Sequence, residues 1–453
     1  MKRLIVSLGA LALLGGCGLF DGKGKPKTPT VGERIAVLSA EASIEADPAL
    51  ADVAVIVPPA VANAEWPQPG GNAANSMTHV SLGTALSRAW SIDIGQGGNS
   101  RIRLASAPVV GGGKIYVIDA MADLRAFDPA NGRQIWRAQV GDAKETRGGM
   151  SLWSGEYTGS SALLFGGGVS YDNGRVYATN GLGDTAAFDA ATGAQIWRVR
   201  PGGPLRGAPT IANDNVYVVS QDNQLFALDP ADGKTRWQES GSVELAGVFG
   251  TAAPAAAQGT VVAGFSSGEL NAYRYENGRG LWQDVLARTS ISTVVGTLSD
   301  IDANPVIDAG RVYAIGQGGR MVALELNTGQ RIWEINAAGM SNPWVAGEWI
   351  FVVTDQAQLL AIARSSGKVR WISQLRRFRD EEDKKGQIYW RGPLLAGDRL
   401  ILVNSIGELV NVSPANGQVQ SVAATKQDIS LPPIVADNTL YILSDDGKLS
   451  AWR

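Results

Sequence analysis

One order of apolar runs, glycines and a closing tryptophan recurs along the chain. Clear copies occupy residues 107–140, 208–240 and 304–336. Further copies begin at Ala253, Asn342, Gly392 and Pro432, and a longer copy ends at Trp197. Self-similarity of this kind is the signature of a repeat architecture, in which each unit buries its apolar face against its neighbours. The repeat therefore restricts the fold more than any other feature of the sequence.

Each unit contains four short strand-like runs separated by turn residues. In the first unit the runs lie near Pro108–Val110, Lys114–Asp119, Leu124–Asp128 and Gln134–Val140. Asn131-Gly132 between the last two tolerates the positive φ angles of a tight turn. With 56 glycines and only 18% charged residues, the composition suits a β-rich chain with many turns. Four strands per unit without helices predict the blade of a β-propeller.

The number of blades follows from the closing residue of each unit. Six units end in tryptophan, at Trp136, Trp197, Trp237, Trp282, Trp333 and Trp371. The seventh has Ser421 there, and the eighth starts at Pro432 and stops at Arg453 after three strands. Residues 86–94 read like the missing fourth strand, with Trp90 in place, and pairing them with the C-terminal strand would remove an open sheet edge. We predict an all-β, eight-bladed propeller of four-stranded antiparallel blades, closed by an N-terminal strand.

The N-terminus reads as an export signal. Lys2 and Arg3 precede an apolar run of 11 residues, Leu4–Leu14, which is too short to span a bilayer as a helix. Leu14-Gly15-Gly16-Cys17 resembles the bacterial lipobox, which implies cleavage before Cys17 and lipidation of that residue. An ordinary signal peptide that contains a cysteine is the alternative. By the same resemblance, Gly18 favours transfer to the outer membrane, with the protein on its periplasmic face.

These features divide the chain into three parts. Residues 1–16 are predicted to be the signal peptide, and residues 17–64, rich in Gly, Lys, Pro and Ala, a flexible lipid-anchored tether. Residues 65–453 are predicted to form the propeller.

Charge and residue counts exclude several function classes. The net charge of −3 argues against a nucleic-acid partner, which would need a basic face. One cysteine and one histidine cannot build the usual Cys/His zinc site or a Cys–His catalytic pair in the mature body. We expect no metal site, no cofactor and no enzyme activity, and His79, which lies in a polar stretch, is expected at the surface.

Three units end in the pattern Ala-x-Asp-x-x-x-Gly-x-x-x-Trp, as in Ala126/Asp128/Gly132/Trp136, and three later units keep its Ala, Gly and Trp but have Arg274, Glu325 and Ala363 in place of the Asp. This pattern resembles the tryptophan-docking repeat of pyrroloquinoline-quinone (PQQ) dehydrogenases. Glycine suits the turn, and tryptophan can pack between blades while its N–H meets a backbone acceptor. The tryptophans are therefore predicted to be structural.

The signal, the lipobox and all eight repeats resemble the propeller lipoprotein subunit of the outer-membrane β-barrel assembly machinery (BamB-type). Two loops extend the resemblance: Leu205 and Arg206 lie in a Leu-Arg-Gly loop, and Asp300 and Asp302 in a Ser-Asp-x-Asp segment. The resemblance implies that these four residues bind the periplasmic domains of the central barrel subunit, in a complex with other lipoproteins. An exposed Leu beside an Arg is typical of an interface anchor.

Other interpretations remain open. Leu205 and Arg206 could simply form a turn, and the two aspartates could cap a strand, pair with Arg206 or weakly bind Ca²⁺. A generic periplasmic propeller scaffold and a PQQ-dependent dehydrogenase are the alternative functions. The dehydrogenases are longer, and many have a Cys–Cys disulfide that no part of this propeller can form. The charged loop 376–385 reads as a solvated insertion, and the Gly-rich stretch 148–168 as another.

Overall fold

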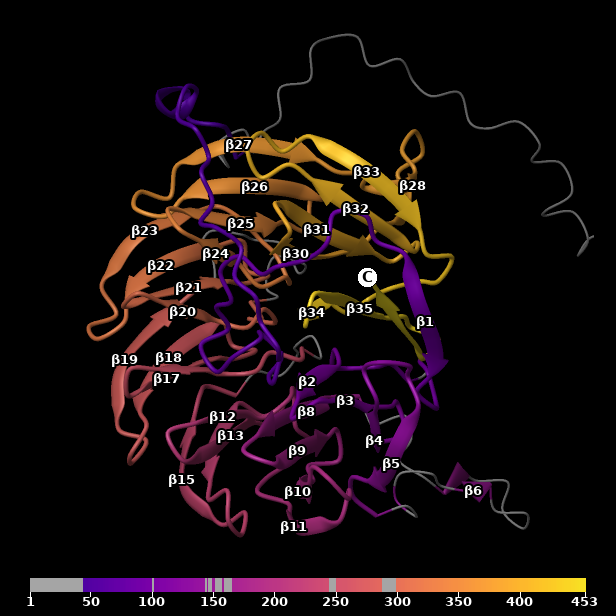
Figure 1. The fold of residues 1–453 in the computed structure, drawn as a ribbon. Coiled ribbons are helices and arrows are strands. Elements are labelled where there is room, and N and C mark those ends of the chain that lie inside the picture. Colours follow the sequence, from indigo (N-terminus) through magenta and orange to yellow (C-terminus); the bar gives the residue numbers. More distant parts are fainter. Residues whose placement is uncertain are drawn as a thin grey trace, which may run out of the picture. The chain divides into compact units, whose positions relative to one another are not determined.

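The computed structural model describes residues 44–99, 102–142, 145, 149–150, 157–158, 165–243, 250–286 and 299–453. Eight four-stranded antiparallel sheets form a closed ring in this part of the chain (Figure 1). The first strand of each sheet is innermost and the fourth outermost. Blade 1 consists of β2 (Val109–Gly111), β3 (Lys114–Ile118), β4 (Asp123–Phe127) and β5 (Gln134–Gln139), and blade 2 of β8 (Gly167–Asp172), β9 (Arg175–Asn180), β10 (Thr185–Asp189) and β11 (Gln195–Val199). Blade 3 consists of β12 (Thr210–Ala212), β13 (Asn215–Val219), β14 (Gln224–Leu228) and β15 (Thr235–Ser240), and blade 4 of β16 (Ala255–Ala257), β17 (Thr260–Gly264), β18 (Glu269–Arg274) and β19 (Gly280–Val285).

The remaining blades repeat the same order. Blade 5 consists of β20 (Val306–Asp308), β21 (Arg311–Ile315), β22 (Met321–Glu325) and β23 (Arg331–Ile335), and blade 6 of β24 (Trp344–Ala346), β25 (Trp349–Val353), β26 (Gln358–Ala363) and β27 (Val369–Gln374). Blade 7 consists of β30 (Trp390–Ala396), β31 (Arg399–Asn404), β32 (Glu408–Val412) and β33 (Val419–Ala424), and blade 8 of β34 (Ile434–Ala436), β35 (Thr439–Leu443), β36 (Lys448–Trp452) and β1 (Arg88–Asp93). Two small hairpins, β6 (Gly149–Met150) with β7 (Tyr157–Thr158) and β28 (Phe378–Asp380) with β29 (Lys385–Gln387), and one 3₁₀ turn, η1 (Pro48–Leu50), complete the elements described.

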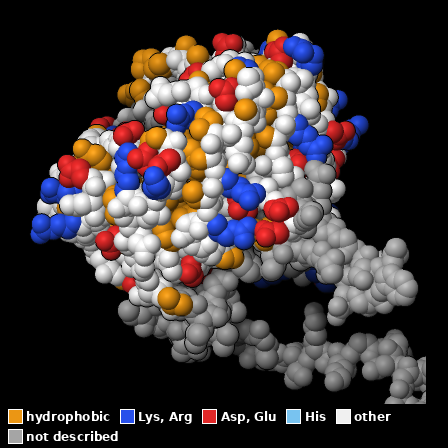
Figure 2. Space-filling model, turned by 90° about the horizontal axis from the view of Figure 1, so that it is seen from below, with side chains coloured by type: hydrophobic (Ala, Val, Ile, Leu, Met, Phe, Trp, Pro, Cys, Tyr) orange, Lys and Arg blue, Asp and Glu red, His pale blue; other side chains and the backbone are white. Residues whose placement is uncertain are grey.

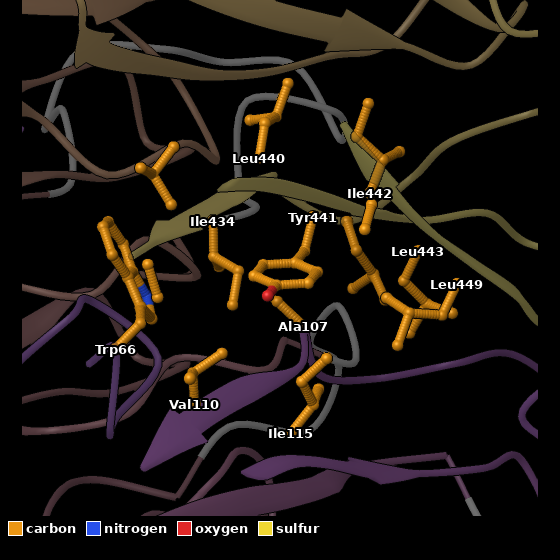
Figure 3. Close-up of a cluster of buried hydrophobic side chains, with 14 of the residues drawn as sticks. Trp66, Ala107, Val110, Ile115, Ile434, Leu440, Tyr441, Ile442, Leu443 and Leu449 are labelled. Atoms are coloured by element: carbon orange, nitrogen blue, oxygen red, sulfur yellow. The ribbon is translucent and has the colours of Figure 1, made fainter. Parts of the chain in front are cut away.

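The predicted closure of the ring is confirmed. Strand β1 pairs antiparallel with β36, so that Ser91 faces Ser450 and Ile92 faces Leu449. The first blade then packs against the eighth. Figure 3 shows apolar side chains from β34 to β36, such as Tyr441 and Leu449, facing Val110 and Ile115 of blade 1. This contact joins the two ends of the repeat array, and the pairing with β1 covers the outer edge of β36.

The tryptophans dock between blades, as the repeat pattern predicts. The indole N–H of each donates to a carbonyl in the turn between the third and fourth strands of the next blade; for Trp197 the acceptor is Pro230 O, at 2.9 Å. The glycine of that turn lies against the same ring: a Cβ on Gly233, whose φ is +76°, would stand 2.7 Å from Trp197. The same arrangement holds for Trp90, Trp136, Trp237, Trp282, Trp333 and Trp371.

This geometry explains the missing tryptophan of blade 7. A tryptophan at Ser421 would dock onto the turn between the third and fourth strands of blade 8. Blade 8 has no such turn, because its third strand, β36, and its fourth strand, β1, are not consecutive in the chain: β36 ends at Trp452 and β1 begins at Arg88. With no turn to receive a side chain, all six residues of β33 are exposed.

Residues 61–80, here called the N-terminal clasp, contact all eight blades. The clasp makes a hydrogen bond to each blade in turn, first to blade 8 and then to blades 1 to 7. In that order the bonds join Asn63 O to Asp437 N, Trp66 N to Val110 O, Pro67 O to Tyr171 N, Gln68 Oε1 to Ile211 N, Ala73 O to Ala256 N, Ala74 O to Ile307 N, Thr78 O to Trp344 Nε1 and Val80 N to Leu395 O. All eight blade residues lie on or next to an innermost strand. The clasp therefore follows the inner rim of the ring from blade to blade.

Two predictions about the N-terminal region are wrong. Residues 44–64 are not a free tether: Asp47 N donates to Val369 O at 2.8 Å, and Val55 is buried in the core of blades 6 and 7. His79 is not a surface residue but fully buried, because the clasp lies against the ring. Its Nδ1 lies 2.7 Å from Pro58 O, and its Nε2 accepts from Asp398 N at 3.0 Å.

Of the two predicted insertions, the structure describes the charged loop 376–385 in full and the stretch 148–168 only in part. Residues 379–385 are exposed in the hairpin β28–β29, in agreement with a solvated insertion. Most of the stretch 148–168 lies outside the described residues, as do the signal peptide and Cys17. In the part of the chain that is described, no helix has the length and apolarity needed to cross a membrane.

Candidate partner-binding site

The predicted binding loops lie on one face of the ring. In a blade of four antiparallel strands, the connection to the next blade and the turn between the second and third strands lie at the same end. Leu205 and Arg206 precede β12, and Asp300 and Asp302 precede β20, so all four belong to this end, here called the connection face. The turns that receive the tryptophans lie at the opposite end.

Leu205 and Arg206 are buried, which corrects the expectation of an exposed pair. Leu205 is bridged to Ser220, and Arg206 N donates to Val219 O at 2.8 Å, so the loop extends the sheet of blade 3. Leu205 has no exposed surface and packs between blades 2 and 3, in the cluster that contains Tyr177 and Phe226. Arg206 is 2% exposed. Neither side chain can reach a partner without rearrangement of the loop.

The two predicted regions meet through Arg206 and Asp302. The Arg206 Nη2 atom lies 3.0 Å from Asp302 Oδ1 and also donates to Ile301 O at 3.2 Å. Gln317, in the turn after β21, donates to Asp302 Oδ2. The loop before blade 3 is thus joined to the loop before blade 5, past the connection that leads into blade 4. The interpretation of Asp302 as a partner of Arg206 is confirmed.

Gly250 makes this contact across blade 4 possible. A Cβ on Gly250 would lie 1.4 Å from Asp302 Oδ1 and 2.5 Å from Arg206 Nη2. Only glycine therefore fits in the connection to blade 4 while the pair stays intact. Asp300 is 1% exposed, and its carbonyl accepts from Gln317 N at 2.9 Å.

The electrostatics of Asp302 reflect its burial. Removal from water raises the pKa of Asp302 to about 6, and the nearby Asp300 carboxylate adds to the rise, whereas Arg206 opposes it. The carboxyl group therefore titrates near neutrality. No group of three or more His, Cys, Asp or Glu side chains within the described ranges is arranged to hold a metal ion.

Exposed residues of blade 3 lie on the same connection face as the buried pair. Pro204 precedes Leu205, Asp222 lies in the turn between β13 and β14, and Val243 follows β15. All three are exposed, and Val243 keeps 75% of its surface. They are here called the blade 3 rim. Sequence analysis missed them because it followed the motif residues, although each lies in a loop or turn of the same end of blade 3.

Charge is mixed on the surface. On the side of the molecule in Figure 2, acidic and basic side chains are interspersed, with apolar groups between them. Such a surface has no extended field of one sign on that side, and it does not favour a nucleic acid there.

The family model and a relative that match this chain both belong to one family of proteins. The family model described as outer membrane protein assembly factor BamB matches residues 36–152 and 143–373. The outer membrane protein assembly factor BamB of Salmonella typhimurium is 28% identical over 366 residues, which are 80% of this chain and 87% of the relative.

Two solved structures share the fold. The crystal structure of BamB from Moraxella catarrhalis has a TM-score of 0.65 at 20% identity and covers 82% of this chain and 100% of its own. Quinohemoprotein alcohol dehydrogenase from Comamonas testosteroni also has a TM-score of 0.65, at 15% identity, covering 87% of this chain and 81% of its own. At such low identity both structures support the propeller fold alone.

Proposed function

The chain belongs to the BamB family of outer membrane protein assembly factors, and we propose that it is a non-catalytic scaffold subunit of the outer-membrane β-barrel assembly machinery. In this role it docks onto the periplasmic domains of the central barrel subunit, beside other lipoproteins of the complex, and aids assembly and insertion of outer-membrane proteins. The observation that carries the proposal is the family match, which begins at residue 36, ahead of the N-terminal clasp, and extends into blade 6.

On the connection face, the buried and the exposed residues would have different roles in docking. Leu205, Arg206, Asp300 and Asp302 are buried and would act on the partner by holding their loops in one arrangement. The blade 3 rim would make the direct contacts. An exposed valine at the same end of blade 3 as an exposed carboxylate offers an apolar anchor beside a polar group, the usual composition of a docking patch.

Lipidation of Cys17 would hold the protein on the periplasmic face of the outer membrane. Several acyl chains on one residue give a firm anchor, because each buried CH₂ contributes about 0.8 kcal/mol. A lipid-anchored tether would end no later than Asp47, because the amide and carboxylate of Asp47 both bind blade 6.

The test is co-purification from solubilised outer membranes of the host bacterium. The tagged full-length chain should recover the central barrel subunit, identified by mass spectrometry. Val243→Asp should recover much less of it, and Glu276→Lys, an exposed residue on the opposite end of blade 4, should recover as much as wild type. A generic scaffold would instead recover other partners and leave the barrel subunit in the unbound fraction.

A further inference from the structure

A cavity of about 270 Å³ lies at the axis of the ring. Its lining comes from the innermost strands and from the connections that lead into them, on all eight blades. The N-terminal clasp contributes Trp66, Pro69, Gly70 and Asn75. The rings of Trp66 and Trp344 stack at 6.2 Å with 16° between their planes and form an apolar wall.

The cavity contains a cation that lacks a counter-ion. Arg391, at the start of β30, donates from Nε to Ser430 O at 2.7 Å and from Nη1 to Trp390 O at 3.2 Å. Both acceptors are neutral carbonyls, whereas a guanidinium group has five N–H donors. Among the residues that the structure describes, no carboxylate forms an ion pair with Arg391. Arg391 is half-buried, and a charge that is partly removed from water without an ionic partner is costly, so a bound anion would relieve part of this penalty.

The acidic group that lines the cavity already has partners. Asp302 lines the same cavity, but its two oxygens bind Arg206 and Gln317. Asp302 and Asp445 attract Arg391 only at longer range, and burial lowers the pKa of the Arg391 guanidinium. The donors of Arg391 therefore remain available to something that enters the cavity.

We propose that the axial cavity is a binding site for a small oxyanion, a carboxylate or a phosphate, held by the Arg391 guanidinium. Arginine suits this role because its planar fork can donate two parallel hydrogen bonds to one oxyanion. The volume is just below the range of about 300–1,000 Å³ of clefts that hold drug-sized molecules, so the ligand is a small solute and not a folded segment. Such binding is independent of the docking proposed above.

The test measures thermal unfolding of the full chain in sodium phosphate and, separately, in sodium acetate, each against sodium chloride of equal ionic strength. A ligand that binds the folded state raises the unfolding midpoint in a saturable way. We expect this for wild type with at least one of the two anions, and isothermal titration calorimetry should give about one site per chain. The anion that binds identifies the preferred chemistry, phosphate or carboxylate.

Variants assign the effect to Arg391. Arg391→Gln should weaken anion binding at least tenfold, and Arg391→Lys, which keeps the charge but loses the fork, should weaken it less. Arg279→Gln, an exposed arginine in a turn of blade 4, serves as the control and should bind like wild type. If Arg391→Gln does not fold, Arg391→Lys alone still decides between the outcomes. A wild-type response no larger than that to chloride, or equal responses of wild type and both Arg391 variants, would overturn the proposal.

Discussion

Arg206 and Asp302 form a buried ion pair, 3.0 Å from Nη2 to Oδ1, across the two connections that lead into blades 3 and 5. The pair spans the width of blade 4 at its inner end, and Gly250 leaves the space for it. Both partners are at least 90% buried, so each depends on the other for charge compensation. The arrangement of the connection face at blades 3 to 5 therefore depends on this contact.

The effects of removing the two partners should not be additive. Arg206→Ala leaves the Asp302 carboxylate buried without its cation, and we expect a loss of about 3–5 kcal/mol in the free energy of unfolding. The double variant Arg206→Ala with Asp302→Asn should be less destabilised than the sum of the two single variants. Urea unfolding of all four proteins gives the coupling energy. Strict additivity would mean that the pair contributes no coupling.

The stability of the protein should depend on pH through Asp302. Its pKa of about 6 in the folded protein exceeds the ordinary value of 3.8, so the folded state binds the proton more tightly than the unfolded chain. The contribution of Asp302 to stability is thus fully present below about pH 4 and is lost as the pH rises through about 6. The loss is at most about 3 kcal/mol.

Asp302→Asn should lack this dependence. The informative quantity is the difference in unfolding free energy between wild type and Asp302→Asn, measured from about pH 4 to pH 7.5. We expect wild type to lose stability relative to the variant across this interval. A difference that stays constant would show that Asp302 has an ordinary pKa.

The glycine of the tryptophan-docking turn should tolerate no side chain. Gly233→Ala adds a Cβ 2.7 Å from Trp197 to a backbone at φ +76°. Gly113→Ala is the matched control: its φ is +71°, but no atom lies within 4 Å of the added Cβ. We expect about 1–2 kcal/mol of destabilisation from backbone strain in both variants, and about 1–3 kcal/mol more for Gly233→Ala from overpacking. Equal effects in chemical denaturation would mean that the Trp197 contact is unimportant.

The anchor can be tested independently of the fold. Cys17→Ser removes the sulfur that would carry the lipid, so we expect the protein to be absent from the outer-membrane fraction. Cell fractionation followed by immunoblotting detects the change, and labelling with a radioactive fatty acid should mark wild type only. Recovery of the variant with outer membranes at the wild-type level would contradict lipid anchoring at Cys17.

Much of the fold could be predicted because the repeat encodes it locally. The glycine, tryptophan and strand pattern of each unit specifies four strands and a docking contact, and Trp90 revealed where the ring closes. From the sequence alone, Ser421 was only a position at which the closing tryptophan is missing. Its explanation required the ring, since only the ring shows that blade 8 has no turn to receive a tryptophan.

The features that sequence analysis missed depend on contacts between distant residues. The N-terminal clasp has neither helical nor strand periodicity, because its hydrogen bonds go to eight strands far away in the chain. His79 is buried for the same reason. Leu205 and Arg206 were correctly assigned to a loop, but a loop near the axis of a ring is covered by its neighbours, and burial there cannot be read from the loop sequence.

The most direct test of the proposed function is the affinity of the purified chain for the purified periplasmic domains of the central barrel subunit, measured by isothermal titration calorimetry. We expect one-to-one binding by wild type. Val243→Asp should bind about 1–3 kcal/mol more weakly, the usual loss for an interface anchor, while Glu276→Lys should bind like wild type. Absence of binding by well-folded wild type would contradict the docking role, and equal affinities of wild type and Val243→Asp would exclude the blade 3 rim as the contact surface.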